Sequence, residues 1–241
     1  MVGSLQKYAL ITGASSGIGR ATALALAQAG FDLAVVSRSK EALDQVADEA
    51  RTHGVSVEVF PFDLSRVDDV RSTIETIIQT CGAIDVLINN AGMGYTGRLD
   101  EMSLSDWQHV MDLNLTSPFL CTQAILPHMR DRHQGTIVNI ASIAGYQAFP
   151  EWGAYSVSKA GMIMLSKAFA TESRDDGVRV VTLSPGAVNT PIWDSDTVHA
   201  DFDRSKMLTP DIVAQAIVHC VTLPQHAVIE DIKIMPGGGA L

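Results

Sequence analysis

Short apolar runs alternate along the whole chain with longer stretches in which apolar residues recur at helical spacing. Seven of the short runs are predicted to be β-strands, and several are apolar nearly throughout, which is typical of strands buried on both faces of a parallel sheet. In chain order they cover residues 8–14, 32–38, 55–63, 84–92, 135–142, 178–186 and 228–236.

The stretches between these runs predict helices. In the first of them, Ile18, Ala21, Ala25 and Leu26 fall on one face of a helix. The alternation predicts one α/β domain over residues 1–241, a doubly wound, Rossmann-type parallel sheet of about seven strands with helices on both faces. The expected helices cover residues 18–29, 40–53, 67–80, 105–132, 153–175 and 209–222.

Residues 189–208 have no regular period. Loops of this length inside a compact domain are often functional. We therefore expect this segment to be a substrate lid that is mobile in the free protein and closes over the substrate.

Composition and charge narrow the class of protein. The chain has 241 residues, of which 46% are hydrophobic and 18% charged, which is typical of a compact globular protein. Its formal net charge of −10 argues against a nucleic-acid partner, which would need a basic face. No apolar run reaches the roughly 18 residues that span a bilayer. The first strand-like run begins near Lys7, so we expect no signal peptide.

The cysteines and histidines show no metal-binding pattern. The three cysteines are far apart and odd in number, as expected of reduced thiols, and the seven histidines are scattered. We expect a cytoplasmic protein with no membrane partner and no metal site.

A glycine-rich turn follows the first predicted strand. The stretch "TGASSGIG", residues 12–19, contains Gly13, Gly17 and Gly19, which allow a tight turn and a close backbone approach to a pyrophosphate. The helix that follows offers its free N–H groups to phosphates. Glycine-rich turns are common, but here a strand precedes the turn and a helix follows it, as a dinucleotide site requires.

Four further motifs follow in order: "NNAG" at 89–92, Asn114, Ser142 and "YSVSK" at 155–159. Together with the glycine turn, they resemble the short-chain dehydrogenase/reductase family over essentially the whole chain. The resemblance implies an enzyme that uses a nicotinamide cofactor. It also implies a catalytic set made of Asn114, Ser142, Tyr155 and Lys159.

Tyr155 and Lys159 are four residues apart, so they share one face of a helix. A free tyrosine has a pKa of about 10, and a nearby ammonium favours the phenolate, so we expect Lys159 to lower the pKa of Tyr155. The resemblance implies that Tyr155 exchanges a proton with the substrate oxygen, which Ser142 orients, and that Lys159 also binds the nicotinamide ribose. It implies that Asn114 bends its helix and holds a water linked to the lysine; a polar residue satisfied by its own neighbours is an equal alternative.

The end of the second strand indicates NADP(H). NAD-binding members of the family usually carry an acidic residue there, whereas this chain has Ser37 followed by Arg38. A carboxylate would repel the 2′-phosphate of NADP, and a guanidinium can bind it with two hydrogen bonds. A solvated surface arginine is the alternative. Ser16 stands where a second basic residue would strengthen the preference, so selectivity is expected to be incomplete.

The resemblance implies further cofactor contacts. Asp63 would bind the adenine amino group, with a helix N-cap as the alternative, and Thr190 would bind the carboxamide. Pro185 and Gly186 would turn the chain under the nicotinamide. The complete expected set is Gly13, Ser15, Ser16, Gly17, Ile18, Gly19, Ser37, Arg38, Asp63, Leu64, Asn90, Ala91, Gly92, Tyr155, Lys159, Pro185, Gly186, Val188 and Thr190.

The expected substrate pocket is apolar. No lysine or arginine stands among its expected residues to bind a carboxylate or phosphate, so a hydrophobic ketone is the predicted substrate. We assign substrate contact to Ser142, Tyr95, Trp152 and Trp193, with Ile143, Tyr146 and Phe149 as further lining residues.

The predicted function is NADPH-dependent reduction of a ketone to a secondary alcohol. A 3-oxoacyl-[acyl-carrier-protein] reductase, expected to carry basic residues for its acidic carrier, and an NAD(P)-dependent alcohol or polyol dehydrogenase are alternatives. A non-catalytic NADP-binding protein would commonly lack the tyrosine or lysine, and both are present.

The resemblance implies a homo-oligomer, with a tetramer favoured over a dimer. Helices 105–132 and 153–175 would form one interface, and the C-terminal "IMPGGGAL" is a candidate for another.

Overall fold

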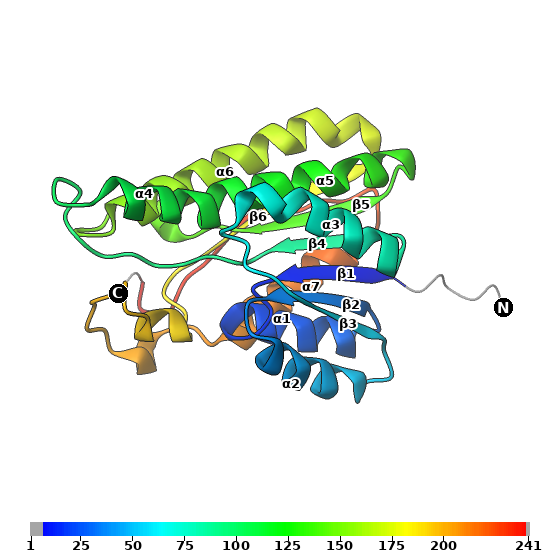
Figure 1. The fold of residues 1–241 in the computed structure, drawn as a ribbon, viewed down its shortest axis with the longest axis horizontal. Helices are drawn as coiled ribbons and strands as arrows, with labels where there is room; N and C mark the ends of the chain where they lie inside the picture. The colour runs from blue at the N-terminus through cyan, green and yellow to red at the C-terminus, as the bar shows by residue number, and fades with distance from the viewer. Residues whose placement is uncertain (1–6, 240–241) are drawn as a thin grey trace.

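A parallel β-sheet forms the centre of the molecule (Figure 1). The structure is a computed structural model that describes residues 7–239. The strand order is β3-β2-β1-β4-β5-β6-β7, and each neighbouring pair is parallel. The predicted doubly wound sheet is confirmed. The strands are β1 (Tyr8–Thr12), β2 (Asp32–Ser37), β3 (Val57–Pro61), β4 (Val86–Asn89), β5 (Gly135–Ile140), β6 (Val178–Pro185) and β7 (Asp231–Ile234).

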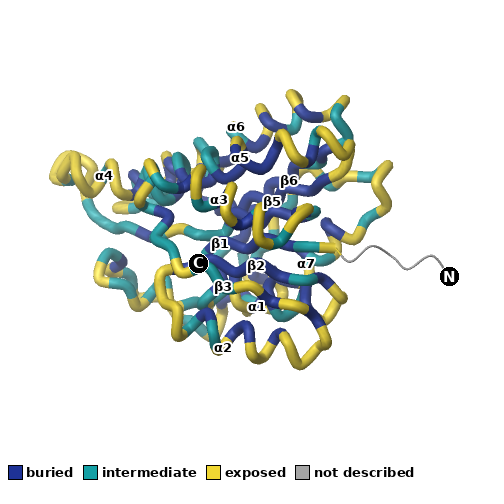
Figure 2. The backbone as a smooth tube through the Cα atoms, turned by 45° about the vertical axis from the view of Figure 1, so that its right-hand side comes forward, coloured by how far each residue is buried: buried dark blue, intermediate teal, exposed yellow. Residues whose placement is uncertain are grey.

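Helices cover both faces of the sheet. On one face α1, α2 and α7 pack on alternate strand residues such as Ala9 and Ile11. On the other face α3, α5 and α6 pack on the strand residues between them, such as Leu10. Figure 2 shows the inner strands buried and the outward sides of the helices exposed. The helices are α1 (Gly17–Gln28), α2 (Lys40–Arg51), α3 (Val67–Cys81), α4 (Leu104–Met111), α5 (Ser117–Asp131), α6 (Gly153–Ser173) and α7 (Pro210–Thr222).

The helix predicted over 105–132 has an interruption. A π-helical turn, Asp112–Thr116, joins α4 to α5 without a break in the chain. Such turns are rare and frequently lie at functional sites. The one here carries the buried Asn114.

The predicted lid, residues 189–208, contains more local structure than its sequence indicates. Two short 3₁₀ turns, Pro191–Asp194 and Arg204–Lys206, lie within it. The second turn is capped by Asp203, whose carboxylate accepts hydrogen bonds from Ser205.

The two ends of the chain, residues 1–6 and the last two residues of "IMPGGGAL", lie outside the described part. Within residues 7–239 no helix has the length and apolar character needed to cross a membrane. In the same part of the chain, no three acidic, histidine or cysteine side chains form a group that would hold a metal ion.

Candidate active site

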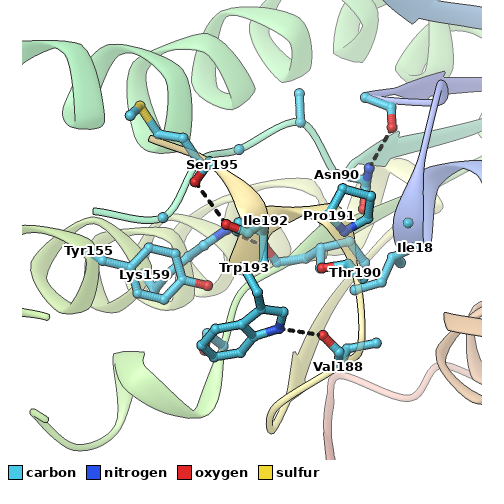
Figure 3. Close-up of a pocket in the computed structure, with 18 of the residues that line it drawn as sticks. Ile18, Asn90, Tyr155, Lys159, Val188, Thr190, Pro191, Ile192, Trp193 and Ser195 are labelled. Atoms are coloured by element: carbon cyan, nitrogen blue, oxygen red, sulfur yellow. Dashed lines mark hydrogen bonds between the residues drawn. The ribbon is translucent and has the colours of Figure 1, made fainter. Parts of the chain in front are cut away.

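A cavity of about 780 Å³ opens at the carboxyl edge of the sheet. In open α/β sheets this edge is where ligands bind, because the loops that leave the strands gather there. The close-up in Figure 3 shows side chains from α6, from the glycine turn and from the lid facing one space. The cavity therefore brings together residues as far apart in the chain as Gly13 and Phe202.

The glycine turn forms one end of this cavity. Gly13 and Gly17 have φ of 65° and 51°, in the left-handed region that favours glycine. A Cβ on Gly19 would lie 2.1 Å from the Gly13 carbonyl oxygen, so no side chain fits there. Asn90 fixes the turn from the neighbouring strand, since its Nδ2 donates to the Thr12 oxygen at 3.0 Å and to the Gly13 oxygen at 3.1 Å. The predicted turn and the "NNAG" motif are thus one structural unit.

The end of β2 presents a hydroxyl that is left over. Ser37 lines the cavity, and its buried Oγ has no hydrogen-bond partner among the described residues. Buried hydroxyls are normally paired, so this unpaired hydroxyl, on a residue that lines the cavity, is a candidate partner for a polar ligand. Arg38 follows, exposed at the cavity wall. A polar group and a cation therefore stand where the sequence placed them.

Asp63 and Leu64 line the same end of the cavity. Burial opposes ionisation of Asp63, but hydrogen bonds from Ser65 and the charge of Arg38 hold the pKa of its carboxyl below the usual value. The alternative that Asp63 is the N-cap of the following helix is wrong, because α3 begins at Val67 and Arg66 is its N-cap.

Lys159 is buried under the cavity. Its Nζ donates to the Ile140 carbonyl oxygen at 2.9 Å and lies 5.7 Å from the centre of the Tyr155 ring. Burial lowers the pKa of Lys159 to about 8. The lysine therefore loses its charge more readily than an exposed one does.

The expected effect on Tyr155 is wrong for this structure. Burial raises the pKa of Tyr155, and a hydrogen bond with the Ser142 hydroxyl opposes that rise without reversing it. Lys159 donates to a backbone oxygen and not to the phenol, so desolvation decides the direction of the shift in the Tyr155 pKa. Tyr155 is therefore a neutral phenol, able to give a proton.

Ser142 follows β5 and begins a short 3₁₀ turn, Ile143–Gly145. Its Oγ accepts a hydrogen bond from Ala144 N at 3.2 Å, which leaves the hydroxyl proton to be donated to Tyr155 or to the oxygen of a bound molecule. The loop ahead of α6 thus places Ser142 at the cavity wall together with Tyr155 and Lys159. A proton donor, a second hydroxyl and a buried cation lining one cavity can protonate an oxygen of a bound molecule.

Asn114 does not line the cavity but holds its wall. Its Oδ1 accepts from Met93 N at 2.8 Å, and its Nδ2 donates to the Met93 oxygen at 2.9 Å and to Ser158 Oγ at 3.1 Å. Ser158 Oγ in turn donates to the Tyr155 carbonyl at 2.7 Å. Asn114 therefore connects the loop after β4 to the first turn of α6, and the expected bend is the π-helical turn.

The loop after β6 closes the cavity on its other side, through Pro185, Gly186, Val188 and Thr190. A Cβ on Gly186 would lie 2.9 Å from Pro236 Cδ, so packing against the segment after β7 already requires glycine there. From the sequence we expected the flat ring of a cofactor to require this glycine.

Aromatic side chains line the far end of the cavity. Trp152 packs edge-to-face on Tyr155 at 5.3 Å and on Trp193 at 5.6 Å, and Trp193 packs in the same way on Phe202 at 5.3 Å, all between ring centres. Figure 3 shows the Trp193 indole donating to the Val188 carbonyl, a bond of 2.7 Å. The two tryptophans predicted for the substrate end therefore lie there, in one aromatic row that starts at Tyr155.

Two expected lining residues are not part of the cavity. The Tyr95 hydroxyl donates to Asp106 Oδ2 at 3.3 Å, because Gly94 faces the cavity and the next side chain points the other way. Tyr146 is 37% exposed, and its hydroxyl donates to Asp231. Glu151, in the segment expected between Ser142 and α6, and His199 and Asp201, in the predicted lid, also line the cavity, although no regular pattern singled out these side chains.

Comparison with known proteins agrees with this geometry. The model of the short chain dehydrogenase family matches residues 7–200. An uncharacterized oxidoreductase of Staphylococcus aureus strain USA300 is 33% identical over 95% of this chain and 97% of its own.

Two solved structures share the whole fold. An alcohol dehydrogenase of the archaeon Thermococcus sibiricus, complexed with 5-hydroxy-NADP, has a TM-score of 0.88 at 30% identity over 97% of both chains. A metagenomic short-chain oxidoreductase in complex with NADP has a TM-score of 0.84 at 30% identity over 95% of this chain and 96% of its own. The family motifs, the cavity and these matches, which extend over nearly the full length, show that the chain belongs to the short-chain dehydrogenase family of oxidoreductases.

Proposed function

We propose that this protein is an NADP(H)-dependent oxidoreductase that reduces a ketone to a secondary alcohol. The observation that carries the proposal is the meeting of Tyr155, Ser142 and Lys159 at the wall of one cavity whose other end is the glycine turn. A nucleotide-binding end and a proton-donating end within one cavity fit a reduction by a dinucleotide.

The residues present fit NADP(H). The backbone of the glycine turn lines the cavity, which suits a close approach of phosphates, and the buried, unpaired Ser37 Oγ belongs to a residue that lines the same cavity. Arg38 at the same wall suits a 2′-phosphate, and two similar structures contain NADP or a derivative of it. Asp63 and Leu64 would adjoin the adenine, and Thr190 the nicotinamide. When bound, NADPH supplies the hydride.

The chain's own residues handle the proton. Tyr155 is neutral because burial raises its pKa, so it donates its hydroxyl proton to the carbonyl oxygen of the substrate. Ser142 donates a hydrogen bond to the same oxygen and orients it. Lys159, held by the Ile140 carbonyl, keeps a positive charge near the phenol and stabilises the phenolate that remains. Oxidation of an alcohol is the reverse sequence.

A neutral, partly aromatic ketone suits the far end of the cavity. Trp152 and Trp193 offer apolar faces, and the charged residues beside them are the acids Glu151 and Asp201. An acidic mouth would repel an acidic carrier protein, which favours a small-molecule ketone over a carrier-bound one. The similar structures include the acetoin dehydrogenase of Salmonella typhimurium, with a TM-score of 0.88 at 28% identity, and this supports chemistry between a hydroxyl and a carbonyl.

We infer that the protein works as a homo-oligomer in the cytoplasm, with a tetramer favoured over a dimer. Exposed apolar residues on α6, Val157 and Met164, favour assembly through that helix. The free thiols Cys81, Cys121 and Cys220 suit a reducing compartment.

Kinetics of the Tyr155→Phe variant test the proposal. NADPH oxidation is followed by absorbance with a panel of ketones, and NADPH binding is measured separately by fluorescence. The variant loses only the hydroxyl, so we expect a loss of at least about a hundredfold in kcat, the lower end of what a general acid contributes, with unchanged NADPH affinity. Turnover like that of the unmodified enzyme would contradict the role of Tyr155, and a lack of NADPH binding by either protein would contradict the cofactor.

A further inference from the structure

Hydrogen bonds tie the lid to the loop that follows β4. Thr96 N donates to the Thr197 carbonyl at 2.8 Å, and Thr197 Oγ1 donates to the Gly94 carbonyl at 2.7 Å. His199 N donates to Thr96 Oγ1 at 2.8 Å. These partners are about a hundred residues apart in sequence. We call residues 94–97 together with residues 197–199 the clasp.

The same loop also holds the segment ahead of α6. Gly97 N donates to the Glu151 carbonyl at 2.8 Å, and Gly97 forms a parallel bridge with Trp152. Glu151 has a φ of 65°, which is unfavourable for a residue with a side chain and persists only where surrounding contacts impose it. The clasp therefore fixes the backbone on which Trp152 is mounted.

Gly94 is the point where the lid and this segment meet. A Cβ on Gly94 would lie 2.6 Å from Val198 Cγ2, 3.4 Å from Trp152 Cζ3 and 3.5 Å from Ile192 Cγ1. Val198 is 5% exposed, so its side chain has little room to move away. Close packing at Gly94 and the clasp hydrogen bonds act on the same two segments.

The lid is tied a second time at its other end. Arg204 donates to the Thr190 carbonyl at 3.2 Å and pairs with Asp194 at 3.0 Å. Ser195 Oγ donates to the Ile192 carbonyl at 2.8 Å within the turn that carries Trp193 (Figure 3). The two ties therefore fasten the lid on either side of residues 200–203.

We propose that Thr96 and Thr197 are positioning residues that determine which substrates the enzyme accepts. By docking the lid onto the loop after β4, they hold Trp193 edge-to-face on Trp152 and so preform the aromatic wall of the substrate cavity. A large aromatic ketone then finds its binding surface assembled, whereas a small ketone near Tyr155 does not need that surface. This inference deepens the proposed function and rests on it only for the substrate measurements.

The first measurement needs no substrate. Two indoles in close edge-to-face contact couple their electronic transitions, which produces a paired positive and negative band in circular dichroism. Trp193→Phe removes the pair and so defines the signal that belongs to it. Thr197→Val, which removes the hydroxyl at nearly the same volume, should reduce that signal by half or more. Thr171→Val is the matched control, because its hydroxyl donates only to Lys167 O within α6, and it should leave the signal unchanged.

The second measurement compares a large aromatic ketone with a small aliphatic one. Thr197→Val should raise KM for the large ketone about two- to tenfold, the effect of one hydrogen bond, with kcat, the small ketone and NADPH affinity changed less than twofold. In a Trp193→Ala background, Thr197→Val should add nothing, because the surface that it positions is gone. If Thr197→Val does not fold, Gly94→Ala replaces it. Its methyl group would collide with Val198 of the lid, so it should also raise KM for the large ketone.

The outcomes separate the two proposals. An unchanged dichroism signal in Thr197→Val, or an equal KM rise with and without Trp193, would overturn the positioning role. If no ketone is reduced but the dichroism signal still depends on Thr197, the proposed function is wrong, whereas the role of the clasp in positioning Trp193 is supported.

Discussion

Replacing Lys159 by methionine should stabilise the cofactor-free protein at neutral pH. Lys159 is 5% exposed, and burial lowers its pKa from 10.5 to about 8. Because the ammonium is better solvated in the unfolded chain, this difference destabilises the fold by roughly 3 kcal/mol, at about 1.4 kcal/mol per pH unit. Removing the hydrogen bond to Ile140 O offsets about 1 kcal/mol of the gain. The net increase in the free energy of unfolding is then about 2 kcal/mol.

The stability difference between Lys159→Met and the wild-type protein should decrease as the pH rises. Below pH 8 the lysine is charged in both the folded and the unfolded protein, so the destabilisation is complete. Between pH 8 and 10.5 only the unfolded chain still binds the proton, so the stability of the wild-type protein rises with pH. Methionine binds no proton. The advantage of the variant should therefore shrink from about 2 kcal/mol at pH 7 to below about 0.5 kcal/mol at pH 9.5.

Urea denaturation at pH 7 and pH 9.5, at one protein concentration and without cofactor, measures the difference. Lys167→Met is the matched control, since Lys167 is exposed on the same helix, and it should change stability by less than about 0.5 kcal/mol, equally at both pH values. A Lys159→Met protein that is less stable at pH 7, or whose difference from the wild type is the same at both pH values, would refute the reasoning.

Three further substitutions test other parts of the site. Arg38→Ala should weaken NADPH binding by about 1.5–3 kcal/mol, the scale of a charged hydrogen bond, with little effect on NADH; titrations that show equal weakening of both cofactors would contradict 2′-phosphate binding. Trp193→Ala should raise KM for a bulky aromatic ketone more than for a small one, because apolar contact area is lost, and an equal loss on both would indicate a purely structural tryptophan. Gly186→Ala should lower stability by about 1–3 kcal/mol through overpacking on Pro236, seen as a lower urea midpoint; reduced cofactor affinity at unchanged stability would instead favour a contact with the nicotinamide.

The sheet was predictable from the sequence because strands that are buried on both faces are apolar nearly throughout, and few other structures produce short runs of that kind. Strand ends were less predictable, since the residues that leave the sheet, such as Asn90, serve the site and carry no strand pattern. Tyr155 and Lys159 were found because one helix sets their spacing. The contact of Thr96 with Thr197 was not, because it joins irregular segments far apart in the chain. The pKa of Tyr155 depends on burial and on where the Lys159 ammonium points, and neither is visible in their spacing.

Asn114 makes the two hydrogen bonds with Met93 that a facing residue of an antiparallel strand would make, one given and one received. The side-chain amide of Asn114 therefore gives the loop after β4 the hydrogen-bond partner that a neighbouring strand would provide. Aspartate has nearly the same shape but cannot donate when ionised, so it would leave the Met93 carbonyl unpaired. Asn114→Asp should therefore be disruptive although the two side chains have nearly the same shape. The fold requires a side chain that both donates and accepts a hydrogen bond at this position, and size alone is not sufficient.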